Sequence, residues 1–152
     1  MTLEWLEKLA QALEVDTGDL ISARHGRAIE DLGEMASSGL VTPSEGGFAD
    51  ARPPLLLEVP ARDPVSVRLT ARIGPFQEGT ILIGDRLPSA SRGEAHGRYC
   101  LASLVNGPLL LRRVVIDAQV RIALVPYDGS DPVLLEVEVD WLAPLVLVLR
   151  YL

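Results

Sequence analysis

The sequence predicts a mainly β protein, with a barrel-like β body preceded by a short α-helical segment. Two stretches, residues 65–73 and 133–141, alternate apolar and polar residues with the period of two that is typical of half-buried strands. Hydrophobic residues make up 48% of the chain but aromatic residues only 5%, so Val, Leu, Ile and Ala dominate, which favours strands and small helices. The 152 residues suffice for one compact domain with a short appendage.

An amphipathic helix is expected at the start of the chain, with Thr2 as its N-cap. Charged and polar residues occupy one face, and apolar residues recur with the helical period on the other. The apolar positions are Leu3, Leu6, Leu9, Ala10 and Leu13. A second short helical turn is expected through residues 20–21, capped by Asp16 or Thr17.

A weaker helical pattern covers residues 24–36 and is interrupted by Gly33. Residues 37–54 combine Ser, Gly and Pro in the manner of a linker that has no core of its own. The expected organisation is therefore a helical segment over residues 1–22, a helix and flexible linker over residues 23–54, and a β domain over residues 55–152.

Four further apolar stretches are expected as strands, at residues 80–83, 98–105, 109–116 and 120–125. The pair Asn106-Gly107 separates two of them, and this dipeptide is a strong signal for a two-residue hairpin turn. Together with the alternating stretches and the end of the chain, they amount to about seven short strands, which is typical of barrel-like sheets.

The last of these strands is apolar on both faces, and a single sheet covers only one face of a strand. An exposed second face would be a contiguous apolar patch, whereas a two-fold partner could cover it with the same strand. We therefore expect a homodimer, although the sequence does not say which face is outward. The expected interface residues are Leu145, Val146, Leu147, Val148 and Leu149.

Composition excludes several classes of function. The 14 basic and 21 acidic residues give a net charge of −7, which argues against a surface that binds nucleic acid by itself. Lys8 is the only lysine, Cys100 the only cysteine, and His25 and His96 the only histidines. Neither a disulfide, a metal site nor a cofactor is therefore expected. No apolar run is long enough to span a membrane and no signal peptide is visible, so a cytoplasmic location without a membrane partner is expected.

Residues 3–21, with the sequence LEWLEKLAQALEVDTGDLI, resemble the last part of an XRE-type helix-turn-helix domain. The β body resembles the C-terminal domain of LexA-like and phage-repressor proteins, whose fold signal peptidases share. The carrying segments are GTILI at residues 79–83, GRYCLA at 97–102, NGPLLLRRV at 106–114, and residues 137–149. The two resemblances imply a prophage-repressor-like transcriptional regulator, with residues 1–22 as the helix-turn-helix remnant.

Active members of that family cleave an Ala-Gly or Cys-Gly bond in their own linker, with a serine whose proton is taken by a neutral lysine. Here Ala71 occupies the expected nucleophile position and Arg112 the expected base position, and neither scissile dipeptide occurs. An arginine, whose pKa lies above about 12, does not act as a general base. The resemblance therefore implies a degenerate peptidase-like domain that is not an enzyme.

An XRE domain places its recognition helix before the helix expected here from Thr2, and the sequence opens at Met1. Either the chain is a fragment of a longer regulator or its native start omits the DNA reader. We therefore expect no DNA-binding residue in this chain, and DNA contact only through a recognition helix that it lacks.

A few residues permit sharper interpretations. Ser91 and His96, with Asp85 and Glu94 nearby, suggest a hydrolytic set. Hydrolytic triads assemble across a fold rather than within one short segment, so a polar loop is favoured. Cys100 is expected to be a small buried residue rather than a reactive thiol.

Arg112 and Arg113 could bind phosphate, but a salt bridge with the acidic row of residues 136–140 is favoured. That row consists of Glu136, Glu138 and Asp140, which is more typical of a solvated strand face than of a metal site. Trp5 and Trp141 could mark binding pockets. Trp5 is expected to pack its helix against the missing helix-turn-helix partners, or against the β body.

The leading interpretation is a dimerisation and regulatory domain of a repressor-like transcription regulator that brings two DNA readers together. The runner-up is a sensor module in which the vacated serine/lysine cleft binds a small molecule or a peptide strand. A serine hydrolase built on Ser91 and His96 comes third. The expected partners are a second copy of the chain and an unknown effector.

Overall fold

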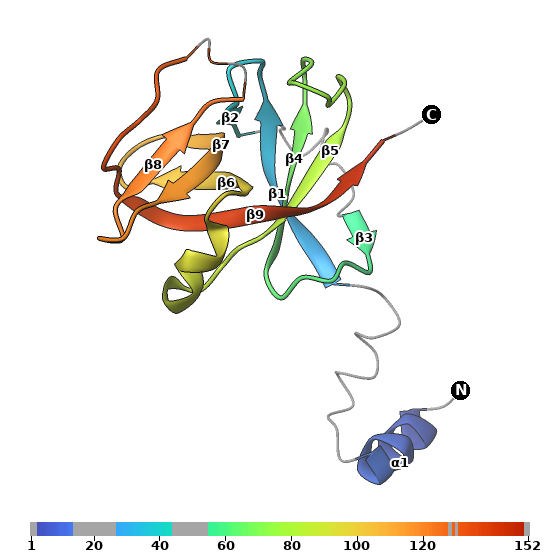
Figure 1. Cartoon of the computed structure of the whole chain (residues 1–152). Coiled ribbons are helices and arrows are strands. Elements are labelled where there is room, and N and C mark those ends of the chain that lie inside the picture. Colours follow the sequence, from blue (N-terminus) through green and yellow to red (C-terminus); the bar gives the residue numbers. More distant parts are fainter. Residues whose placement is uncertain (1–2, 14–26, 44–54, 128, 130, 151–152) are drawn as a thin grey trace.

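A computed structural model describes residues 3–13, 27–43, 55–127, 129 and 131–150. These residues contain one α-helix, nine β-strands and a short 3-10 helix (Figure 1). The helices are α1 (Leu3–Leu13) and η1 (Ser89–Ala95). The strands are β1 (Arg27–Met35), β2 (Leu40–Thr42), β3 (Leu55–Leu57), β4 (Pro64–Leu69), β5 (Ile81–Asp85), β6 (Tyr99–Leu104), β7 (Leu109–Ile116), β8 (Ile122–Val125) and β9 (Val139–Leu149).

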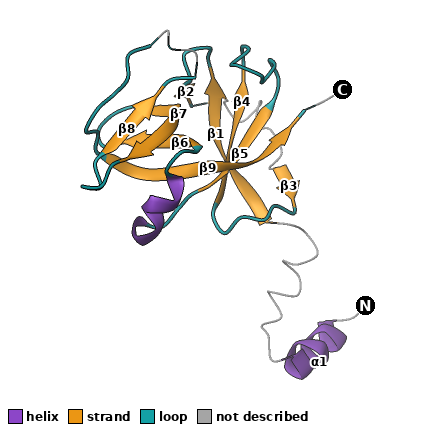
Figure 2. Cartoon of the chain, viewed as in Figure 1, coloured by secondary structure: helices purple, strands orange, loops and turns teal. Residues whose placement is uncertain are grey.

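Seven of the described strands close into a barrel, as the mainly β prediction anticipates. Hydrogen-bonded neighbours follow the order β2-β1-β4-β5-β9-β6-β7, and β2 also pairs with β7, which closes the ring. Within the ring β1 and β4 run parallel and the other pairs are antiparallel. Strand β8 extends the sheet beyond β7, β3 pairs with β1 outside the ring, and η1 lies beside β9 (Figure 2).

Helix α1 forms where the amphipathic pattern predicts it. Lys8 lies 3.7 Å from Glu4 in an exposed i,i+4 ion pair on its polar face. Trp5 is 55% exposed, so the expectation that it packs against the β body is wrong for the described residues. Thr2 and the expected turn at residues 16–21 lie outside the described part of the chain. Among the described helices, none has the length and apolar character needed to cross a bilayer.

Strand β1 occupies a stretch where the sequence pattern favoured a helix, so that prediction is wrong. Gly33 has a φ of +125° and donates its N–H to Asp31 Oδ1 at 3.0 Å, and the register of β1 against β4 shifts at this point. The irregularity places Leu32 and Met35, three residues apart, against the same interior core. A bulged strand has thereby produced the three-residue spacing that resembles a helix.

The linker interpretation is also wrong for part of its range. Residues 40–42 form β2, which pairs with both β1 and β7 and so closes the barrel. The turn before β2 contains Gly39, whose carbonyl accepts a hydrogen bond from the N–H of Leu111 at 2.9 Å. Residues 44–54, the rest of the expected linker, lie outside the described residues.

The two alternating stretches are strands only in part. Strand β4 ends at Leu69, and the chain then turns so that Ile73 forms an isolated bridge with Phe76. In the second stretch, residues 133–138 precede β9 and are not a continuous strand. Glu136 has a φ of +52°, which interrupts an extended strand.

The expected hairpin joins β6 to β7, but its turn is longer than two residues. The N–H of Leu104 donates to the carbonyl of Pro108 at 3.2 Å, which leaves three residues in the turn. Asn106 has a φ of +52°, whereas Gly107 does not have a positive φ. Asn tolerates the left-handed conformation, which explains why the dipeptide still marks the turn correctly.

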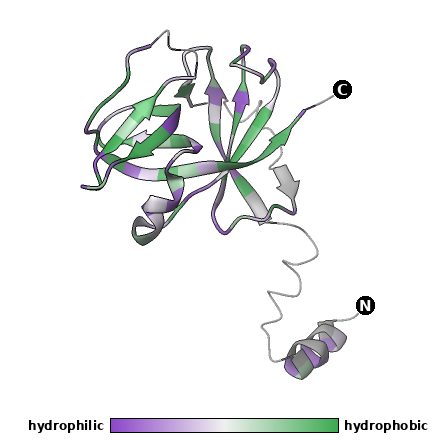
Figure 3. Cartoon of the chain, in the orientation of Figure 1, coloured by the Kyte–Doolittle hydropathy of each residue, from purple (hydrophilic) through white to green (hydrophobic). Residues whose placement is uncertain are grey.

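Three apolar cores surround the barrel wall, and β9 contributes to all of them. Ala143 belongs to the interior core, Leu142 to a second core beneath η1, and Leu147 packs on a third core at β5. Apolar residues run along most of β9, as Figure 3 shows, because this strand packs against cores on both of its faces. The largest fully buried side chains include Met35, Leu69, Leu82, Ile83, Leu101, Leu111, Leu124 and Leu142.

Candidate functional site

The positions where the resemblance places a nucleophile and a base carry no catalytic pair. Ala71, half-buried in the turn after β4, has no hydroxyl. Arg112 in β7 is only 6% exposed, and its Nη1 donates to the carbonyls of Ser38 at 2.9 Å and Leu111 at 2.8 Å. Its Nη2 lies 3.5 Å from Oδ2 of Asp131. Because an arginine stays protonated, Arg112 fastens the β1–β2 turn to β7 and offers no base.

Aromatic rings pack against the turn that follows Ala71. Tyr127 stacks on Tyr99 with ring centroids 4.6 Å apart, and Phe76 meets Tyr127 edge-on at 6.1 Å. Gly74 has a φ of +52°, and a Cβ added there would overlap the Tyr127 ring. The space beside Gly74 is therefore occupied by the ring of Tyr127.

The arginine pair of β7 does not bond with the acidic row as predicted. Arg112 pairs with Asp131 instead, and Arg113 is exposed. The arginine that reaches the row is Arg121, whose Nη1 lies 2.9 Å from Oε1 of Glu136. The reason is that the segment before β9 hydrogen-bonds along β8 rather than along β7.

The suggested hydrolytic set is not assembled among the described contacts. His96 follows η1, and its Nδ1 accepts a hydrogen bond from the N–H of Ile116 at 2.9 Å, so this nitrogen is bound to β7. Asp85 accepts the backbone N–H groups of residues 62 and 63 at 3.2 and 3.0 Å. Ser91 lies half-buried within η1. These contacts give His96 and Asp85 roles in holding loops rather than a proton relay.

Cys100 is fully buried in the core beneath η1, as the alternation of its strand predicts. Burial raises the pKa of its thiol from 9.0 to about 12, and the positive charge of Arg98 opposes this rise only in part. The thiol therefore stays protonated at neutral pH. A protonated, buried thiol is a poor nucleophile and a poor metal ligand.

The acidic row does not form one strand face. Glu136 has a left-handed backbone conformation, and its carboxylate is paired with Arg121. Strand β9 begins only after Glu138. In the described ranges, no group of three or more His, Cys, Asp or Glu residues is arranged to hold a metal ion. Trp141 also has a contact within the fold, because the Arg86 guanidinium lies 4.7 Å from the centroid of its ring.

Strand β9 changes neighbours along its length. Residues 139–144 pair with β6, and residues 145–149 pair with β5. Among the described strands, residues 145–149 thus have a sheet neighbour on one edge only. On this stretch Nη2 of Arg98 donates to the carbonyl of Leu145 at 3.3 Å.

Both faces of residues 145–149 also carry apolar side chains. Leu145 packs on the interior core, and Leu147 and Leu149 pack on the third core near Ile81. Val148 is the outermost of them, at 40% exposure. An interface that uses this strand would therefore be centred on Val148 rather than on Leu147.

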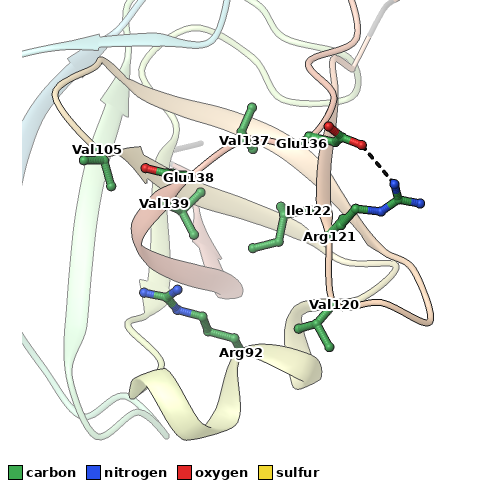
Figure 4. A pocket seen from close by; sticks show the side chains of 9 residues that line it. All are labelled: Arg92, Val105, Val120, Arg121, Ile122, Glu136, Val137, Glu138 and Val139. Carbon is green, nitrogen blue, oxygen red and sulfur yellow. Dashed lines mark hydrogen bonds and ion pairs between the residues drawn. The ribbon is translucent and has the colours of Figure 1, made fainter.

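A groove that sequence reasoning missed lies between η1, the β7–β8 turn and the segment before β9 (Figure 4). Its volume is about 530 Å³, which falls in the range of small-molecule sites. Apolar walls are supplied by Val105, Val120, Ile122, Val137 and Val139. Val120 is 73% exposed and Val105 41%, so both present apolar surface to solvent. An apolar residue in an otherwise polar turn, as at Val120, is the one sequence signal that marks this place.

One charged pair in the groove is already satisfied. Arg121 bonds to Glu136, as the dashed line in Figure 4 shows, and its Nε lies 2.7 Å from Oδ2 of Asp117. The pKa of the Asp117 carboxyl is lowered, chiefly by the hydrogen bond that it accepts from the Arg121 backbone N–H. These bonds fix the β7–β8 turn against the segment before β9.

The other charged side chains of the groove are Arg92 and Glu138. Arg92 rises from η1, and its Nη2 donates to the carbonyl of Asp140 at 2.8 Å. Its buried Nε has no acceptor among the described residues. Within the same part of the chain, neither Arg92 nor Glu138 has an ion-pair partner.

Comparison with known proteins identifies no family for this chain. No protein-family model matches the chain, and no curated protein is similar to it.

Proposed function

We propose that this chain is the dimerisation and regulatory domain of a repressor-like transcription regulator that acts in the cytoplasm and does not cleave itself. The observation that carries this proposal is the role of Arg112. A self-cleaving barrel of the kind that the sequence resembles needs a neutral amine in that position. Here a buried guanidinium is bound to two carbonyls and to Asp131, while Ala71 supplies no hydroxyl.

The assembly half of the proposal is supported by the end of β9. Residues 145–149 leave one strand edge without a sheet neighbour among the described strands and present Val148 outward. A second copy would extend the sheet through the same residues in a two-fold arrangement. Joining two chains in this way raises the effective concentration of any DNA reader that each of them carries.

DNA contact in this proposal belongs to a recognition helix outside the sequence given. The helix α1 then corresponds to the end of a helix-turn-helix domain, and its exposed Trp5 is available to a neighbour in that domain. The net charge of −7 fits a barrel that does not itself hold the DNA phosphates.

Two other interpretations receive less support. A sensor that uses the vacated cleft near Ala71 would need space there, but Tyr127 packs directly on Gly74. A hydrolase based on Ser91 would need a free base, but Nδ1 of His96 already accepts the Ile116 N–H.

The absence of self-cleavage is tested by intact-mass spectrometry after alkaline incubation. A pH of about 9–10 would begin to deprotonate a lysine of ordinary pKa, about 10.4, and would switch on a serine/lysine peptidase. We expect the full mass of 16.4 kDa to persist. A discrete cut between residues 37 and 54, in the presence of inhibitors of contaminating proteases, would overturn the proposal.

A further inference from the structure

The groove beside η1 concentrates backbone strain. Three described non-glycine residues have a left-handed φ, and two of them, Val120 at +63° and Glu136 at +52°, line the groove. The third, Asn106, lies in a hairpin turn where Asn is well tolerated. A β-branched residue in this conformation is an outlier, and strained residues of this kind cluster at ligand sites.

The strained conformation of Val120 is not offset by packing of its side chain within the described chain. Its side chain is 73% exposed, although Gly or Asn would adopt the same turn with less strain. The Arg121–Glu136 pair holds this turn and fixes the apolar side chain at the rim of the groove (Figure 4). The valine therefore lines the rim of the groove without being buried by the described chain.

The charged side chains of the groove indicate which charges a complementary ligand would carry. Arg92 and Glu138 have no ion-pair partner among the described residues, whereas Arg121 and Glu136 neutralise each other. A simple anion would leave Glu138 facing it unpaired, and a simple cation would leave Arg92 unpaired. A ligand with one group of each sign satisfies both residues at once.

We infer that this groove binds a small apolar zwitterion, either a free amino acid with a branched aliphatic side chain or a short apolar peptide. Its carboxylate binds the guanidinium of Arg92, and its ammonium group binds Glu138. The aliphatic body packs on Ile122, Val139 and the strained Val120. The groove lies near β8, whereas the proposed dimer strand ends at the opposite side of the barrel (Figure 1), so this inference does not depend on the dimer.

Chemical-shift titration of the isotope-labelled chain tests the inference, with L-leucine and L-leucyl-L-leucine as probes. We expect at least one probe to bind saturably below about 10 mM, and the probe that binds distinguishes the free amino acid from the peptide. N-acetyl-L-leucine lacks the ammonium group and L-leucinamide lacks the carboxylate, so both should bind more weakly than leucine. Failure of both probes to bind the wild-type chain at this concentration would overturn the inference, as would equal binding of leucine and its two derivatives.

Matched variants locate the site. Arg92→Gln and Glu138→Gln should each lower the affinity for the probe about tenfold or more, because each removes one charge-assisted bond. Arg113→Gln and Glu78→Gln, at exposed positions outside the groove, should bind as the wild type does. Equal affinity in the groove variants and in these controls would overturn the assignment.

Val120→Gly separates a binding role from a purely structural one. The change relieves the left-handed strain, so it should raise the midpoint of unfolding in the absence of probe. It also removes the apolar side chain at the rim, so it should lower the affinity for the probe. A variant that is more stable and binds as tightly as the wild type would remove Val120 from the site.

Discussion

The side chain of Arg112 illustrates what single residues reveal in this chain. The sequence predicts that an arginine in this position cannot act as a base, because that depends on its chemistry alone. Its partners could not be predicted, because Ser38 lies 74 positions before it and Asp131 lies 19 positions after it. A buried guanidinium needs such acceptors, and only the closed barrel brings them together.

Cys100 gives a test at the residue scale. Its thiol should resist iodoacetamide in the folded chain at a pH of about 8.5 and react fully in denaturant, because the folded thiol remains protonated and buried. Native alkylation as fast as that of a free thiol would contradict the described core. The same pKa shift sets a pH dependence, because the unfolded thiol loses its proton near pH 9.0 and the folded thiol near pH 12. The free energy of unfolding should therefore decrease as the pH rises from 9.0 to about 12.

At the scale of elements, the strands with regular alternation could be predicted and the irregular ones could not. The stretches assigned to β5, β6, β7 and β8 lie where the sequence places strands. The sequence of β1 resembles a helix because the bulge at Gly33 shifts its apolar residues out of the period of two. The groove is hard to predict for a related reason, since the left-handed backbone at Val120 and Glu136 changes no hydrophobic period, and one apolar residue in a polar turn is its only signal.

Gly33 tests this explanation of β1. A Cβ at this position would overlap the Thr42 carbonyl, and a φ of +125° is strained for any other residue. Gly33→Ala should therefore lower the free energy of unfolding by about 2–4 kcal/mol, measured by urea denaturation. Gly93→Ala is the matched control, because its added Cβ meets nothing within 4 Å, and its change should stay within about 0.5 kcal/mol. Equal losses in the two variants would contradict the bulge.

For the whole molecule, the mainly β class follows from composition and period, whereas barrel closure does not. Closure depends on β2, a strand of three residues within a stretch that reads as a linker. Such a short strand carries too few residues to show a period. The sequence likewise predicts the apolar character of residues 145–149, but only the pairing of β9 with β5 shows which strand edge has a neighbour.

Assembly of the whole chain is the central claim, and sedimentation equilibrium tests it most directly. At about 10 µM we expect twice the chain mass of 16.4 kDa. Val148→Asp should give a folded monomer. Burying this valine stabilises the dimer by about 1.5–3 kcal/mol, and in the monomer no partner covers it. Leu147→Asp should instead disrupt folding, since Leu147 packs on the third core.

Leu135→Asp is the matched control, because Leu135 is 72% exposed and lies outside the C-terminal strand. It should remain a dimer, and circular dichroism should show that both exposed variants keep the strand content of the wild type. A wild-type chain that sediments at single mass at about 10 µM, or a Val148→Asp variant that stays dimeric, would contradict the account.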